Sequence, residues 1–227
     1  MQADVVSNVA RVKANIERAA RDAGRDPSDV TIVAAAKSTP PGTVRWACES
    51  GIGAVGHNYA QELRDAHAAL ADVDVRWHFI GNLRSGTANL VADTADVVET
   101  VAGERAVRRL AGRAARRGAT LAALVEVDLT GRRHGVAPGD AAAFCAFVEG
   151  LEGLRVTGLM TVPPADAVGE AAAPWFRRLR DLRDQIREKH PQVLDLSMGM
   201  SLDYEVAVRE GATMVRIGTA LFGPRTP

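Results

Sequence analysis

The sequence predicts an α/β fold in which a single (β/α)8 TIM barrel occupies residues 1–227 as one domain. Three observations predict it: eight short apolar runs alternate with longer amphipathic segments, no polar linker separates them, and the length allows one large core. A doubly wound open sheet is the alternative. No Gly-x-Gly-x-x-Gly motif follows the first apolar run, and this counts against a dinucleotide-binding sheet.

The chain opens with an extra helix before the first strand. Residues 1–24 are amphipathic at helical spacing and lack the basic start and apolar centre of a signal peptide, so we expect this helix outside or below the barrel. Gly118 and Gly211 each stop a helical segment before a strand, and Pro138 with Asp140 marks a helix start. The expected strands are 30–36, 53–56, 76–80, 96–100, 121–127, 154–160, 193–197 and 213–217. The expected helices are 43–50, 59–70, 85–92, 103–117, 139–149, 172–189 and 202–210.

The overall charge is balanced, with 28 basic and 28 acidic side chains and a formal net charge of zero. Without a basic excess we expect neither nucleic acid nor a membrane surface as a partner, and no apolar run approaches the roughly 20 residues of a membrane span. Cys48 and Cys145 show no metal-ligand spacing, so we expect no metal site, reduced thiols and a cytoplasmic protein. The polar outer helices favour a monomer.

Lysine is rare in this chain, and arginine supplies most of the basic side chains. Lys13 and Lys189 lie in polar helical patterns, whereas Lys37 ends the apolar run in VTIVAAAKSTPPG, residues 30–42. Arginine keeps its proton, but a desolvated lysine has a lowered pKa and becomes a nucleophile toward an aldehyde. Lys37 is therefore either a lysine that extends to solvent from a strand end or, as we favour, a Schiff-base lysine.

The loops after the seventh and eighth strands predict a phosphate site, because barrels often bind phosphate there. Ser201 is expected to cap the N-terminus of helix 202–210, where its hydroxyl and nearby N–H groups would accept a phosphate; a plain N-cap is the other interpretation. Gly218 allows close backbone approach, and Thr219 adds a hydroxyl and an N–H group.

Arg216 ends the eighth strand between apolar neighbours. It is either paired with a buried carboxylate such as Asp195 or a donor to a ring nitrogen or phosphate at the barrel mouth. An aldehyde-capturing lysine together with a phosphate site indicates pyridoxal 5′-phosphate (PLP) as the cofactor.

Five motifs together resemble the pyridoxal-phosphate homeostasis protein family: AAAKSTP, GHNYAQEL, WHFIGNL, GLMTVPP and LSMGMSLDYEVAVREGATMVRIGTALFG. The motifs occur in order, the last one is long and specific, and the resemblance covers nearly the whole chain, from about residue 5 to residue 225. Members of this family are single-domain relatives of the N-terminal barrel of alanine racemase. The resemblance thus implies a barrel of the alanine racemase N-terminal-domain type.

The resemblance also implies a set of cofactor contacts at one mouth of the barrel. Lys37 would form the Schiff base and Arg216 would face the pyridine nitrogen, while no catalytic residue is established. The cofactor-binding residues would be Lys37, Asn58, His78, Met160, Ser201, Arg216, Gly218 and Thr219.

The implied role is PLP homeostasis: the protein would hold PLP reversibly and hand it to PLP-dependent apoenzymes, without strong catalysis. An arginine at the ring nitrogen makes the cofactor a weaker electron sink. Racemisation also needs a second base, which the resemblance implies comes from a C-terminal domain in alanine racemase, and this chain ends at Pro227 after the eighth βα unit.

Two enzymatic alternatives stay open. A PLP-dependent amino-acid racemase of fold-type III would need a second acid–base residue opposite Lys37, and the candidates are His57, Tyr59, His78 and Tyr204. A lysine-dependent aldolase on a sugar phosphate would need a carboxylate relay, for which Glu126 and Asp128 are the candidates.

Three departures from the family pattern are expected near the mouth or its rim. His57 replaces a usual glutamate, residues 84–87 replace a Gln-x-Asn-Lys segment, and Arg133 replaces a lysine. They put contacts with partners or substrates at the rim in doubt. The segment 161–171 is the best candidate for a mobile loop.

Overall fold

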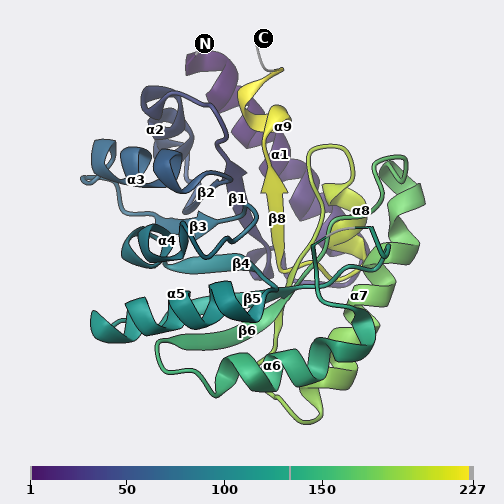
Figure 1. Cartoon of the computed structure of the whole chain (residues 1–227). Helices are drawn as coiled ribbons and strands as arrows, with labels where there is room; N and C mark the ends of the chain where they lie inside the picture. The colour runs from purple at the N-terminus through teal and green to yellow at the C-terminus, as the bar shows by residue number, and fades with distance from the viewer. Residues whose placement is uncertain (1, 133, 225–227) are drawn as a thin grey trace.

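Each apolar run of the sequence becomes a strand of one closed parallel barrel, in the order β1 to β8 (Figure 1). The computed structural model describes residues 2–132 and 134–224. Every expected strand boundary lies within two residues of the observed one. The strands are β1 (Thr31–Ala35), β2 (Ala54–His57), β3 (Arg76–Phe79), β4 (Val97–Val101), β5 (Leu121–Glu126), β6 (Leu154–Met160), β7 (Asp195–Ser197) and β8 (Met214–Ile217).

The helices between the strands surround the barrel, as the alternating pattern predicts. They are α2 (Pro41–Glu49), α3 (Ala60–Ala69), α4 (Ala88–Thr94), α5 (Glu104–Arg116), α6 (Ala141–Glu149), α7 (Ala173–Arg187), α8 (Tyr204–Arg209) and α9 (Thr219–Phe222). Three expected helices begin two or three residues late: α4 starts at Ala88 instead of residue 85, α6 at Ala141 instead of residue 139, and α8 at Tyr204 instead of residue 202. Within the described ranges, no helix combines the length and apolarity needed to cross a bilayer.

The extra helix, α1 (Gln2–Asp22), lies outside the barrel and packs against α2, α8 and α9 (Figure 1). Its buried stripe includes Val5, Val9, Val12 and Ile16, the spacing of one helix face. The helix therefore covers the seam at which the chain's first and last βα units meet. The expected position of this helix is confirmed.

Inside the barrel, side chains alternate with period two along each strand, so residues two apart share a face. Along β4 the buried interior residue Val97 is followed by the buried Glu99, and along β8 Met214 is followed by Arg216. The interior face thus changes from apolar to charged toward the carboxyl end of the strands. The apolar side chains inside the barrel, hereafter the interior apolar cluster, are Val33, Ala54, Ile80, Val97, Ala122, Leu124, Met160 and Met214.

Neighbouring strands of the barrel do not all pair over the same number of residues. Strands β5 and β6 pair over six residues of each strand, whereas β7 and β8 share one registered pair, Ser197 with Met214. Three backbone hydrogen bonds join β7 to β8, and this short pairing is called the seam below. They are donated by the N–H groups of Thr213, Met198 and Arg216, at 3.0 to 3.1 Å. Both strands of the seam carry residues of the site described next.

Candidate functional site

A cavity of about 790 Å³ opens at the carboxyl ends of the strands, where the active sites of such barrels lie. Its volume is in the range of about 300–1,000 Å³ that is usual for small-ligand sites. Seven of the eight predicted site residues line it: Lys37, Asn58, Met160, Ser201, Arg216, Gly218 and Thr219.

Lys37 stands in the turn that follows β1. The next residue, Ser38, adopts a left-handed backbone conformation with φ 57°, and its N–H donates to Glu62 Oε2 at 3.2 Å. The half-buried Lys37 places its Nζ 5.2 Å from the ring centroid of Tyr59. Among the residues that the structure describes, this ammonium makes no hydrogen bond or ion pair, so the amine is available at the mouth of the cavity.

Ser201 does not cap helix α8, and that prediction was wrong. The helix begins at Tyr204, while the Ser201 hydroxyl oxygen accepts from the N–H groups of Gly218 and Ala220, both at 3.2 Å. The serine therefore joins the loop after β7 to the loop after β8. A Cβ atom at Gly218 would lie 3.3 Å from the carbonyl oxygen of Ala35, so glycine permits the close contact of this loop with β1.

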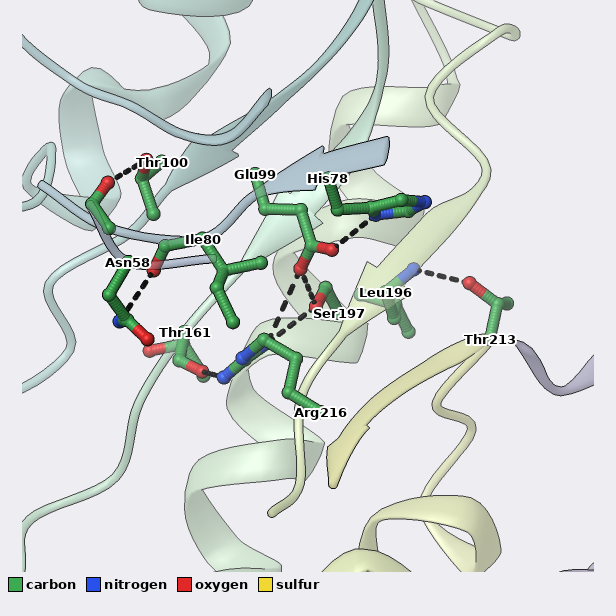
Figure 2. A network of polar contacts seen from close by, with 11 residues as sticks. Asn58, His78, Ile80, Glu99, Thr100, Thr161, Leu196, Ser197, Thr213 and Arg216 are labelled. Atoms are coloured by element: carbon green, nitrogen blue, oxygen red, sulfur yellow. Dashed lines mark hydrogen bonds and ion pairs between the residues drawn. The ribbon is translucent and has the colours of Figure 1, made fainter. Parts of the chain in front are cut away.

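Of the two roles that the sequence left open for Arg216, the structure shows the pairing with a buried carboxylate. Arg216 lines the cavity, and its guanidinium is also paired with a buried carboxylate, which is Glu99 instead of Asp195 (Figure 2). Nη1 donates to the Ser197 hydroxyl and lies 3.8 Å from Glu99 Oε2, while Nη2 donates to the Thr161 carbonyl at 3.0 Å. The guanidinium is thus held against the barrel wall at the floor of the cavity.

Glu99 is the functional candidate that sequence reasoning missed. Its side chain is fully buried, and its two oxygens contact His78 Nδ1 at 2.6 Å and Ser197 Oγ at 2.5 Å. Burial alone would raise the pKa of the Glu99 carboxyl, but the hydrogen bond from His78 and the charge of Arg216 outweigh burial and lower it. The carboxyl is therefore ionised at neutral pH.

His78 is the one predicted site residue that lies away from the cavity. Its ring is buried inside the barrel and donates through Nδ1 to Glu99, since an ionised carboxylate only accepts. Its Nε2 has no hydrogen-bond partner within the described residues. The sequence could not place His78, because the neighbour that fixes its ring comes from another strand.

The structure describes two of the three departures from the family pattern. His57 is buried, faces away from the cavity and stacks on Trp77 with ring centroids 6.4 Å apart. Burial lowers its pKa, against the opposing charge of Glu62. Residues 84–87 are not among those that line the cavity, and Arg133 lies outside the described residues.

The acid–base candidates named for a racemase do not line the cavity. Tyr204 is buried under α1, where its hydroxyl accepts from Asn15 Nδ2 at 2.9 Å. Tyr59 lies beneath Lys37 on the same side of the mouth. The carboxylates that do line the cavity are Glu126 and Asp203, and burial raises the pKa of the Asp203 carboxyl.

A closed eight-stranded parallel barrel with a lysine after its first strand and a serine–glycine–arginine group after its last strands defines a class, the alanine racemase N-terminal-domain barrel. The family described as "Alanine racemase, N-terminal domain" matches residues 7–226. An alanine racemase of Clostridium difficile shares this fold, with a TM-score of 0.75 at 15% identity over 97% of this chain and 58% of that chain.

Closer relatives narrow the class to one family. A pyridoxal phosphate homeostasis protein of Pseudomonas aeruginosa is 39% identical over 97% of this chain and 96% of its own length. The structure of PipY from Synechococcus elongatus with PLP bound has a TM-score of 0.86 at 28% identity, over 96% of this chain and 100% of that chain. The chain belongs to the pyridoxal phosphate homeostasis protein family.

Proposed function

We propose that this protein binds PLP through a reversible covalent bond to Lys37 and acts in PLP homeostasis in the cytoplasm, as a carrier and not as a strong catalyst. One observation carries the proposal: Lys37 lines the same cavity as Ser201, Gly218 and Thr219. The names of the relatives and the PLP held by the PipY structure support it.

The donor set fits the cofactor at both of its ends. When bound, PLP supplies an aldehyde and a conjugated ring that can act as an electron sink. Lys37 supplies a primary amine, which condenses with an aldehyde and releases water. The N–H groups of Gly218 and Ala220 converge on the Ser201 hydroxyl oxygen, which leaves the proton of that hydroxyl as a donor, and hydroxyl donors bind phosphate oxygens.

Arg216 is proposed to face the ring nitrogen, with Asn58, Met160 and Thr219 at the sides of the cofactor. A guanidinium only donates, so it favours a ring nitrogen that carries no proton. Such a ring stabilises a carbanion poorly, and this supports binding over catalysis. A hand-over to PLP-dependent apoenzymes and a monomeric state belong to the same proposal.

The aldolase alternative has less support from the cavity wall. Asp128 Oδ1 accepts from the N–H groups of Thr130 and Gly131 and from the Thr130 hydroxyl, at 2.7 to 3.0 Å. This carboxylate therefore shapes the loop after β5. An aldolase would, in addition, hold no chromophore.

Uptake of PLP by the purified protein tests the proposal. We expect a yellow complex, a cofactor that borohydride fixes to the protein, and a modified peptide that contains Lys37. Lys37→Ala should lose the covalent product but keep affinity through the phosphate, whereas the exposed Lys189→Ala is the matched control and should behave as the wild type. A protein that stays colourless with added PLP would overturn the proposal.

Proton exchange separates the carrier from a racemase. The yellow protein is incubated with single amino acids in deuterated water, and α-proton loss is followed by NMR. We expect exchange no faster than with free PLP. Rapid exchange would favour the racemase.

A further inference from the structure

The buried Glu99 has a role that the proposed cofactor contacts do not use. Its carboxylate lies inside the barrel without solvent contact, in a position where an unpaired charge would strongly destabilise the fold. The groups that face it are the His78 ring from β3 and the Arg216 guanidinium from β8, and the Ser197 hydroxyl from β7 lies between Glu99 and Arg216 (Figure 2). Glu99, on β4, therefore contacts residues of β3, β7 and β8.

The direction of each hydrogen bond in this network follows from the chemistry of the groups. An ionised carboxylate only accepts and a guanidinium only donates. The single proton of Ser197 must consequently point to Glu99 Oε2, at 2.5 Å, and its oxygen accepts from Arg216 Nη1. The orientation of Ser197, and through it the position of Nη1, depends on the negative charge of Glu99.

A second contact fixes the plane of the Arg216 guanidinium. Nη2 donates to the Thr161 carbonyl at 3.0 Å, and the Thr161 hydroxyl donates to the Val127 carbonyl at 2.8 Å. Two anchors, one on β7 and one just after β6, hold a planar group in one orientation, as Figure 2 shows. Only the anchor at Nη1 includes a charge that opposes that of the guanidinium.

We infer that Glu99 is a positioning residue, which acts through Ser197 to fix the guanidinium of Arg216 and to balance its charge at the floor of the cavity. This role rests on the proposed binding of PLP. With Glu99 in place, Arg216 presents an oriented donor to the ring of the cofactor. Without Glu99, Arg216 is a less ordered cation beside the same ring and has lost the carboxylate that faces its Nη1.

The test uses Glu99→Gln in the full chain, because this variant keeps the side-chain shape and removes the charge. We expect the dissociation constant for PLP to rise about tenfold, and the pH midpoint of the absorbance change of the bound cofactor to shift down by about one unit, because the loss of a negative charge nearby disfavours protonation of the cofactor. Asp93→Asn is the matched control, since Asp93 pairs with Arg113 at 2.7 and 2.9 Å on the outer helices, and it should leave both values unchanged.

A double-mutant cycle tells positioning from a merely structural role. If Glu99 acts through Arg216, adding Glu99→Gln to Arg216→Gln changes neither the dissociation constant for PLP nor the pH midpoint any further. If Glu99→Gln lowers thermal stability but leaves the wild-type midpoint and affinity, the inference is overturned. Ser197→Ala keeps the carboxylate of Glu99 and removes the hydroxyl that links it to Arg216. This variant should therefore weaken PLP binding with little change in the pH midpoint of the absorbance change. It replaces Glu99→Gln in the test if Glu99→Gln does not fold.

A measurement on the protein without cofactor keeps this inference separate from the proposed function. The Arg216 guanidinium should give sharp, separate side-chain nitrogen signals by NMR in the wild type and averaged signals in Glu99→Gln. A wild type that takes up no PLP would overturn the proposed function, while unchanged Arg216 signals in Glu99→Gln would overturn the positioning role of Glu99.

Discussion

Two groups of buried side chains fill the same barrel and differ in what holds them. The interior apolar cluster is close-packed and needs no specific partner, because apolar burial is not directional. The polar network of Glu99, His78, Ser197 and Arg216 depends on particular donors and acceptors. The difference teaches that the first group contributes packing without a specific orientation, whereas the second orients the cavity floor.

The two groups lie on the same strands, only two residues apart. Val97 and Met214 belong to the apolar cluster, and Glu99 and Arg216 follow them on the same faces. A substitution in the apolar cluster can therefore be compared with a substitution in the polar network on the same strand. The predictions below test whether the contrast between the groups holds.

The largest expected effect comes from breaking the charge pair on one side. Glu99→Leu leaves the buried Arg216 without its balancing charge and should lower the free energy of unfolding by about 3–5 kcal/mol. Glu99→Leu combined with Arg216→Met should recover most of that loss, because an apolar pair replaces both charges, but it should not bind PLP normally. Urea unfolding followed by circular dichroism measures both, and a double variant as unstable as the single one would contradict the comparison.

A cavity in the apolar cluster should cost stability without a functional cost. Leu124 is fully buried and does not line the cavity, so Leu124→Ala should lower the free energy of unfolding by about 3 kcal/mol while PLP affinity stays at the wild-type value. The exposed Leu194 offers a control, and Leu194→Ala should change stability by less than about 0.5 kcal/mol. A large loss of PLP affinity in Leu124→Ala would blur the distinction between the two groups.

The polar network should also depend on pH, whereas the apolar cluster should not. The folded pKa of Glu99 lies below its unfolded value of about 4.3, so its ionisation stabilises the protein above that pH and the gain is lost as pH falls through the folded pKa. The stability difference between the wild type and Glu99→Gln should therefore shrink in acid. The stability difference between the wild type and Leu124→Ala should stay constant when urea unfolding is repeated at the same pH values. If both differences shrink in parallel as pH falls, the effect cannot be assigned to the ionisation of Glu99.

The smallest of these effects concerns the hydroxyl in the network. Ser197→Ala removes one donor and one acceptor but leaves Glu99 and Arg216 3.8 Å apart, close enough to move into direct contact. We expect a loss of about 1 kcal/mol in the free energy of unfolding. A loss as large as that of Glu99→Leu would mean that the pair cannot close without the serine.

Most of the fold could be predicted because its signals are local. Eight apolar runs separated by amphipathic segments are readable residue by residue, and every strand was located within two residues. Lys37, Ser201 and Arg216 were expected at one mouth, because all carboxyl ends of parallel strands share one end of a barrel. That part of the site follows from topology alone.

The partners of Glu99 and Ser201 could not be predicted, because they depend on register between distant segments. On β4 the register shifts between Val98 and Val101, so that an extra residue faces β5. Glu99 shares the interior face with Val97, and the extra residue lets Thr100 line the cavity as well, although DVVET shows no period-two pattern in the sequence. Ser201 likewise binds N–H groups on the next βα unit, while its sequence context only indicated a local cap.

A closed barrel is expected to open first between the two strands that pair over the fewest residues. In this barrel these strands are β7 and β8, which share a single registered pair. Amide protons of this seam should exchange with deuterium earlier than those between β5 and β6, which pair over six residues. Ser197 and Arg216 lie on the two sides of that seam. Any ligand that contacts both strands should therefore slow this exchange, so that loading of the protein could be timed by the protection of a few amides in a mass spectrum.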